Sequence, residues 1–190
     1  MKCTEIIMQD HVTLRRALQI LDTLVRKMER GERIEIADAV TVLKFIRLFG
    51  VEYHQTIEEK ILFPALLSVA PQETPARHML FEHSDHRTLL GAIDSALSQR
   101  KGIEFAKNVR TLVMLLRNHY DREDQFLRSL EAAGLPKEAD DAVFAEITSS
   151  RKPPESYTYF SALEWKYIPR PQPPLNAGRP YYSRRSANTV

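Results

Sequence analysis

The sequence has little of what would mark a secreted or membrane-bound protein. Its 190 residues include a single cysteine, Cys3, so no disulfide can form within the chain, which fits a reducing compartment. No apolar run approaches the roughly 18 to 20 residues that a membrane-spanning helix needs, and the first residues lack the charged-then-apolar pattern of a secretory signal. We therefore expect a cytoplasmic protein with no membrane contact.

The chain also lacks a strong overall charge, although charge is unevenly distributed. The net charge is +2, yet the segment from Arg151 onward holds seven Lys or Arg residues and only two acidic ones. The first 150 residues therefore carry a net charge of −3. A mildly acidic folded part argues against nucleic-acid binding by general electrostatics.

Strand-like alternation is absent, and long amphipathic helical patterns take its place. Apolar residues recur at spacings of three and four over four stretches, which are residues 4–30, 36–70, 74–101 and 105–133. Glycine and proline separate these stretches by short turns. The sequence therefore predicts an all-α protein, an up-down-up-down antiparallel four-helix bundle.

Two features modify this bundle. Pro64 lies inside the second stretch, where it removes one backbone donor and is expected to kink the helix near Lys60. Residues 137–149 predict a short fifth helix that packs on the bundle, so the bundle domain is expected to cover residues 1–150.

A different composition begins after the fifth helix, in residues 151–190. Seven of the eleven prolines lie here, interleaved with aromatic residues, and this density predicts that the extension contains no regular helix or central strand. We expect its aromatic part to dock on the bundle and residues 169–190 to be extended. The basic extension is also a candidate surface for a homodimer or a protein partner.

Polar residues on the apolar stripes are the most informative ones, because burying an ionisable group is costly unless it is paired or bound to metal. His54 and Glu58 are four residues apart, so on a helix both side chains leave one face about one turn apart. His119 and Glu123 repeat this spacing. The other histidines on the stripes are His11, His83 and His86.

The five histidines converge on one end of the predicted bundle. In an antiparallel bundle the starts of the first and third helices lie beside the ends of the second and fourth. Five imidazoles and two carboxylates suit two metal ions, because nitrogen ligands favour iron, zinc, copper or nickel and carboxylates can bridge a pair. Two six-coordinate ions with two bridging carboxylates and a solvent-derived bridge would leave one position open for chemistry or ligand binding.

Four motifs carry a family resemblance. They are DHVTLRRAL, YHQTIEEKILFPAL, LFEHSDHRTLL and NHYDREDQFL, in this order along the chain. Over about residues 5–130 the chain resembles the hemerythrin-like, or HHE cation-binding, domain family. The resemblance implies a non-heme di-iron centre with an oxo or hydroxo bridge. It also implies that the terminal ligands are His11, His54, His83, His86 and His119, and that the bridges are Glu58 and Glu123.

The chain departs from the oxygen-carrying members of that family at two points. Those members usually have two third-helix histidines four residues apart, whereas His83 and His86 are separated by three, and His83 fits the family's Glu-His position better. Asp124 meets the five-residue spacing of the family's usual aspartate. Periodicity favours Glu123 as the bridge, because Asp124 is rotated about 100° off the stripe.

Three functions are compatible with the sequence. The first is a di-iron protein that binds O2 or a related small ligand as a sensor, carrier or reservoir. The second is an enzyme that turns over peroxide or nitric oxide or oxidises ferrous iron, which extra carboxylates at Glu59, Glu82 and Asp124 would favour. The third is a metal-free helical interaction module with incidental histidines, since a lone histidine on an apolar face is usually a core residue, and His86 could be such an interior histidine.

An apolar wall is expected to keep bulk water from the metals and to control ligand access. Its predicted members are Leu62, Phe63, Leu66 and Phe126.

Overall fold

The chain folds into helices, most of which lie along one long axis. The computed structural model describes residues 1–69, 74–133, 136–150 and 156–169, and every regular element within these ranges is a helix. In chain order the elements are α1 (Lys2–Glu29), α2 (Ile36–Phe45), η1 (Ile46–Gln55), η2 (Glu58–Leu62), α3 (Phe63–Val69), α4 (Thr74–Ser98), α5 (Gly102–Ala133), α6 (Lys137–Ser150) and α7 (Ser156–Tyr167). The predicted all-helical class is confirmed for this part of the chain.

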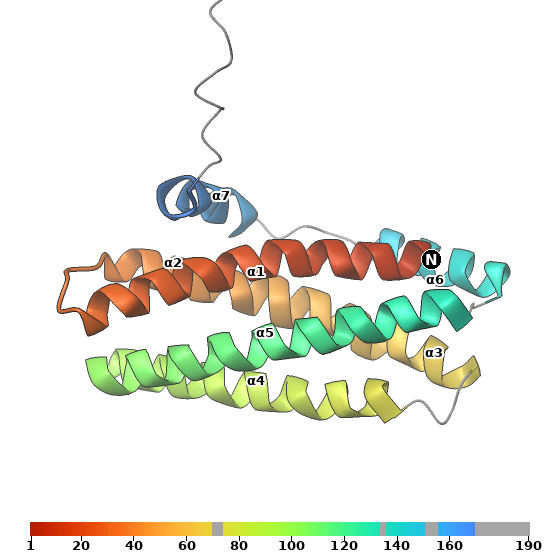
Figure 1. Cartoon of the computed structure of the whole chain (residues 1–190), viewed down its shortest axis with the longest axis horizontal. Coiled ribbons are helices and arrows are strands. Elements are labelled where there is room, and N and C mark those ends of the chain that lie inside the picture. Colours follow the sequence, from red (N-terminus) through yellow and green to blue (C-terminus); the bar gives the residue numbers. More distant parts are fainter. Residues whose placement is uncertain (70–73, 134–135, 151–155, 170–190) are drawn as a thin grey trace, which may run out of the picture.

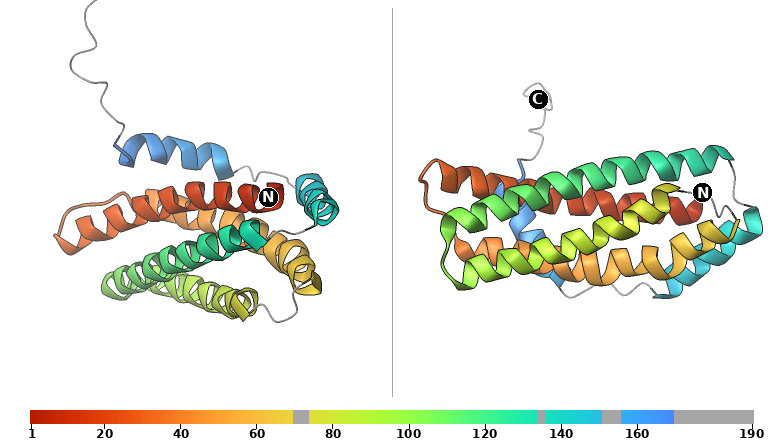
Figure 2. Two further views of the ribbon diagram at one scale, coloured as in Figure 1. Left: turned by 45° about the vertical axis from the view of Figure 1, so that its right-hand side comes forward. Right: turned by 90° about the horizontal axis from the view of Figure 1, so that it is seen from below.

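Four long segments lie side by side: α1, the run from α2 through α3, α4 and α5 (Figure 1). The N-terminus, α3 and α6 gather at one end of the molecule, as the two further views in Figure 2 also show. Asp140 of α6 accepts hydrogen bonds from the backbone N–H groups of Lys2 and Cys3 at 3.0 and 3.1 Å, which ties α6 to the first turn of α1. None of the described helices is long and apolar enough to cross a membrane.

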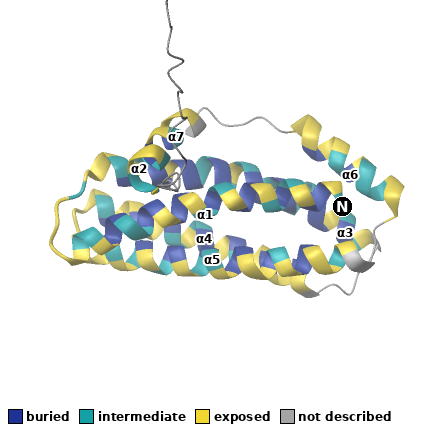
Figure 3. Cartoon of the chain, turned by 45° about the horizontal axis from the view of Figure 1, so that its top comes forward, coloured by how far each residue is buried: buried dark blue, intermediate teal, exposed yellow. Residues whose placement is uncertain are grey.

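Buried apolar side chains form two clusters at different levels of the bundle, and buried positions follow the inner faces of the long helices (Figure 3). On α1, Ile7 belongs to the smaller cluster and Leu14 to the larger one. On α5, Leu116 belongs to the larger cluster and Phe126 to the smaller one. Each of these two helices therefore runs from one apolar cluster to the other, and the short stretch between the clusters is not purely apolar.

The second long segment is wound as a π-helix over much of its length, in η1 and η2. Its i→i+5 hydrogen bonds are rare in proteins and usually limited to single turns, often at functional sites. Gly50 lies within η1, and a Cβ there would stand 3.2 Å from Leu14 Cδ2, so the missing side chain allows close contact with α1. Pro64 is the second residue of α3. The backbone N–H group that it lacks is therefore missing where the winding changes from π to α, four residues after Lys60.

The prediction that residues 151–190 contain no regular helix is wrong, because α7 lies in this extension. The reason is the placement of the prolines. None occurs between Pro154 and Pro169, so a proline-free stretch is long enough for a helix of 12 residues. Most of the segment predicted to be extended, residues 170–190, lies outside the described residues.

The aromatic helix α7 packs on α1 and α2. Phe160 is fully buried, and its ring stacks on Phe45 with the centroids 4.0 Å apart. The hydroxyl of Tyr167 donates a hydrogen bond to Asp38 of α2 at 2.5 Å. The docked helix thus closes the larger apolar cluster on the side of α2.

Replacing Phe160 with alanine is expected to lower the free energy of unfolding by about 3 to 5 kcal/mol, because it leaves a cavity against Phe45. Urea denaturation of the variant beside the wild type measures this difference. Tyr159→Ala is the matched control: Tyr159 is 70% exposed on the same helix, and its loss should change stability by less than about 0.5 kcal/mol. Equal effects of the two substitutions would contradict the docked position of α7.

Candidate metal centre

All seven predicted metal ligands lie in one buried polar layer between the two apolar clusters. On α1, for example, His11 stands between Ile7 of the smaller cluster and Leu14 of the larger one. The exposed fraction of a side chain in this layer does not exceed 2%, for His11, His54, Glu58, His83, His86, His119 and Glu123. Charged and polar groups at such depth require compensating partners.

The inward-facing atoms of this layer form two adjoining groups that share Glu58. One group consists of His11, His54, Glu58 and Glu123, and the other of Glu58, His83 and His119. Within each group one nitrogen or oxygen atom per residue lies within 4.8 Å of the others, close enough to surround a single ion. Among the described residues, His86 belongs to neither group.

Both carboxylates stand between the two groups. Glu58 Oε1 lies 2.8 Å from His54 Nε2, whereas its Oε2 lies 3.3 Å from His83 Nε2, so its two oxygens face different groups. Glu123 Oε2 lies 3.3 Å from His11 Nε2 and 3.4 Å from His119 Nε2. These are the positions that bridging carboxylates would occupy.

The donor atoms of this layer fit cations. Within the described chain, all four carboxylate oxygens of Glu58 and Glu123 are buried without a hydrogen-bond donor in suitable geometry. His11 Nε2 and His54 Nε2 face each other at 3.1 Å, and the Nε2 atoms of His83 and His119 do so at 3.3 Å. Such converging acceptors are costly in an apolar interior unless a positive charge lies between them.

Four acidic side chains face the outer nitrogens of these histidines, and three of them lie within hydrogen-bond distance. The outer Nδ1 atoms face carboxylate oxygens at 2.6 Å (His11 to Asp124), 3.6 Å (His54 to Asp10), 2.9 Å (His83 to Glu59) and 2.7 Å (His119 to Glu82). An Nδ1–H group directed at a carboxylate leaves the lone pair on Nε2, the nitrogen that faces inward. Asp124 therefore stands on the outside of the layer, whereas Glu123 faces its inside.

These outer contacts form a closed ring around the bundle. Each acidic residue directly precedes or follows an inner residue of its own helix, and it reaches the histidine of a neighbouring helix. Taken in order around the bundle, a carboxylate of α1 faces a histidine of η1, one of η2 faces a histidine of α4, one of α4 faces a histidine of α5, and one of α5 faces a histidine of α1. Adjacent helical residues point about 100° apart, so one side chain can face inward while the next faces the adjoining helix.

Arginines extend three of these contacts toward solvent. Arg15 lies 2.9 Å from Asp124, Arg122 lies 2.5 Å from Glu82, and Arg87 contacts Glu59. None of the three arginines is among the site residues predicted from the sequence, and neither are Asp10 and Gln55. A signal was present, because each arginine follows a histidine of its own helix by about one turn, at positions 11 and 15, 83 and 87, and 119 and 122.

A comparison with protein families decides what this layer belongs to. The model of the hemerythrin HHE cation binding domain matches residues 3–128. The chain belongs to this family. The match runs from α1 to α5 and includes every residue of the buried polar layer, so the resemblance that the four motifs indicate is confirmed. No curated protein and no solved structure matches the chain significantly.

In the buried polar layer of the HHE domain, burial and neighbouring charges act on the same pKa values in opposite directions. Burial alone would lower the pKa of His54, but the neighbouring Glu58 carboxylate raises it to about 10. Burial would raise the pKa of Glu58, but His54 and His83 hold it well below its usual range. His54 and Glu58 thus stabilise each other's charged forms across a distance of 2.8 Å.

His86 differs from the other buried histidines of the HHE domain. Its ring lies beside the second group, with centroid distances of 4.9 Å to His119 and 6.3 Å to His83. Its Nδ1 faces the amide nitrogen of Gln55 at 3.2 Å, where the other four histidines face carboxylates. Burial, together with the charges of His119 and His83, lowers the pKa of His86 to about 3, so this imidazole is neutral.

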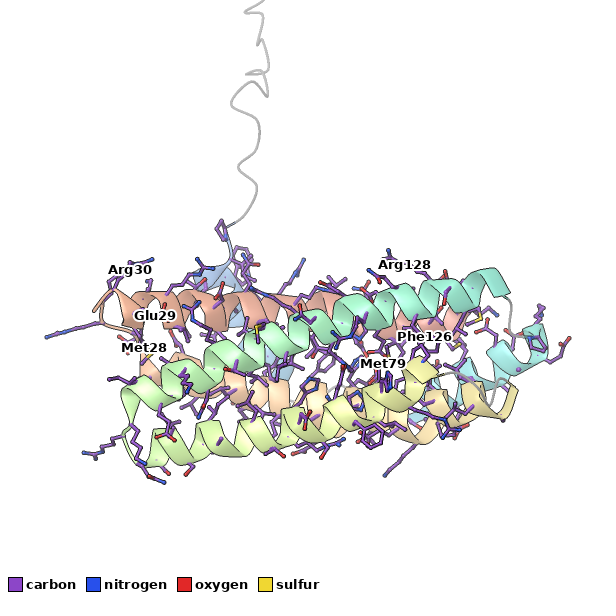
Figure 4. The ribbon with its side chains drawn as sticks, turned by 60° about the horizontal axis from the view of Figure 1, so that its bottom comes forward. Met28, Glu29, Arg30, Met79, Phe126 and Arg128 are labelled. Atoms are coloured by element: carbon purple, nitrogen blue, oxygen red, sulfur yellow. The ribbon has the colours of Figure 1, made fainter. Side chains whose placement is uncertain are left out.

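The expected apolar wall closes the HHE layer at the end near α3 and α6. All four predicted members are buried in the smaller cluster, and the ring of Phe63 stacks on His83 at a centroid distance of 6.1 Å. Met79 and Phe126 face the space between α4 and α5 (Figure 4). They line a recess of about 470 Å³ that also borders Glu82 and Arg122, so solvent reaches the outer side of the layer here.

Replacing Glu82 with alanine is expected to weaken metal binding by about 10- to 100-fold, because His119 loses the acceptor that orients its ring. Competition with a chelator of known affinity measures this change. The metal affinity of Glu82→Gln should lie between those of Glu82→Ala and the wild type. Glu104→Ala removes an exposed carboxylate of α5 and is the matched control. An unchanged affinity in Glu82→Ala would show that the outer contact is dispensable.

Proposed function

We propose that the HHE domain holds two iron ions in its buried polar layer and binds O2 or a related small ligand as a sensor, carrier or reservoir. The observation that carries the proposal is the pair of adjoining donor groups with Glu58 common to both. Imidazole and carboxylate donors together suit iron, and an up-down-up-down bundle would present them from four helices. An iron pair would supply a redox-active centre with a coordination position for a small ligand.

The protein side chains then have separate tasks. His11, His54, His83 and His119 would each offer Nε2 to an ion. The carboxylates that hydrogen-bond His11, His83 and His119 fix the tautomers and ring orientations of these three. Glu58 and Glu123 would span the two ions. The negative charge of the four outer carboxylates offsets the charge of the metal pair, and the apolar wall excludes bulk water.

The extra carboxylates favour binding over turnover. An enzyme that shifts ligands during its cycle needs carboxylates that are free to move onto the metal. Glu59, Glu82 and Asp124 instead hydrogen-bond the outer nitrogens of histidines, and arginines hold them from the other side. This engagement supports a stable centre that binds its ligand reversibly.

The test is a metal count on the purified full-length protein, followed by visible spectra of the ferrous form as O2 is added and removed. Two iron ions per chain and a reversible spectral change are expected. Immediate irreversible oxidation with catalytic loss of added peroxide or nitric oxide would support the enzyme instead. The absence of bound metal, unaffected by His54→Ala combined with His119→Ala, would exclude both metal functions and leave the helical interaction module.

A further inference from the structure

His86 is the one histidine of the buried polar layer that lies outside both donor groups of the described chain. Because Glu123 faces His119 as well as His11, each group has two histidines and the two shared carboxylates, and an ion there would keep free coordination positions. His86 lies beside the second group, the one with His83 and His119, and its ring is 4.9 Å from that of His119.

The partner of His86 sets the position of its ring proton. The amide nitrogen of Gln55 is a donor only, so at 3.2 Å it donates to Nδ1 of His86, which leaves the ring hydrogen on Nε2. A metal ion could bind this nitrogen only by displacing its hydrogen, whereas the N–H group as it stands can donate a hydrogen bond. Three other buried histidines, His11, His83 and His119, show the reverse arrangement, because a carboxylate accepts from Nδ1 and leaves Nε2 free.

We propose that His86 is not a resident metal ligand and instead donates a hydrogen bond from Nε2 to the small ligand held at the second group. This revises the ligand set that the family resemblance implies, and it rests on the proposed function. The donor gives the site a preference for ligands that accept a hydrogen bond when bound, such as O2, nitric oxide and azide. Gln55 is the residue that fixes this role, since an acceptor in its place would reverse the tautomer.

The experiment uses the iron-loaded full-length chain with azide as the probe. His86→Leu should retain two ions per chain and bind azide about 10- to 100-fold more weakly, the usual effect of losing one hydrogen bond to a charged ligand. His86→Gln keeps an N–H donor and should recover part of the affinity. Gln55→Glu should also retain two ions and weaken azide binding, because its carboxylate draws the ring proton to Nδ1.

The controls separate the possible failures. His78→Leu replaces the exposed histidine of α4 and should change neither measurement. Loss of one ion in His86→Leu would make His86 a resident ligand and overturn this inference alone. Unchanged azide affinity in His86→Leu with two ions bound would overturn it as well. A wild-type protein without metal would overturn the proposed function and this inference together.

Discussion

Replacing Glu58 with glutamine is expected to abolish binding of the metal pair, because Glu58 is the one residue common to both donor groups in the described chain. The amide removes the negative charge that would lie between the two ions, so the buried ions lose a charged partner. Removing one partner of a buried ion pair costs about 3 to 5 kcal/mol, which corresponds to a roughly 100- to several-thousandfold loss of affinity. Metal content after dialysis and chelator competition measure the loss.

Glu52→Gln is the matched control for this substitution. Glu52 lies on the same π-wound segment but is exposed, so its metal content should equal that of the wild type. Retention of two tightly bound ions by the Glu58→Gln protein would exclude Glu58 as the bridge. A circular dichroism spectrum of each variant shows whether the helices have formed.

Removal of the metal is expected to lower the melting temperature by about 15 to 30 °C. An ion that binds only the folded state at a thousandfold excess over its dissociation constant stabilises that state by about 4 kcal/mol, and two ions double this. In a chain of this size about 1 kcal/mol corresponds to 2 to 4 °C. The metal-free protein should still fold, because His54 and Glu58 neutralise each other as an ion pair.

Thermal unfolding followed by circular dichroism, with and without a chelator, measures this shift. The His54→Ala and His119→Ala double variant should melt at one temperature whether or not the chelator is present. A wild-type melting temperature that the chelator leaves unchanged would contradict metal binding in the buried layer.

The inner residues were predictable because helical periodicity fixes which side of a helix a residue occupies. His119 and Glu123 interrupt an otherwise apolar stripe, and burial of such groups has few explanations besides a partner or a metal. The π winding around Gly50 was not predictable, since no residue type specifies i→i+5 hydrogen bonds. The helix α7 was missed because proline density was averaged over residues 151–190, although the prolines flank a free stretch.

The outer contacts depend on how helices are placed in space. That Asp124 meets His11 follows from the contact of α5 with α1, which stripe phase on either helix does not define. The Gln55 partner of His86 likewise depends on the exact rotation of η1 toward α4. Stripe phase favours Glu123 without excluding Asp124, and the structure turns Glu123 inward and Asp124 outward.

The closed ring of outer carboxylates also has a mechanical consequence. Each of the four long segments supplies a carboxylate to one neighbour and receives one from the other. A helix that turned about its own axis would pull its inner residue away from the centre and would release the imidazole of the next helix at the same time. The bundle is therefore interlocked against torsion at the depth of the buried polar layer, and a disturbance on any one helix is transmitted around the whole circumference.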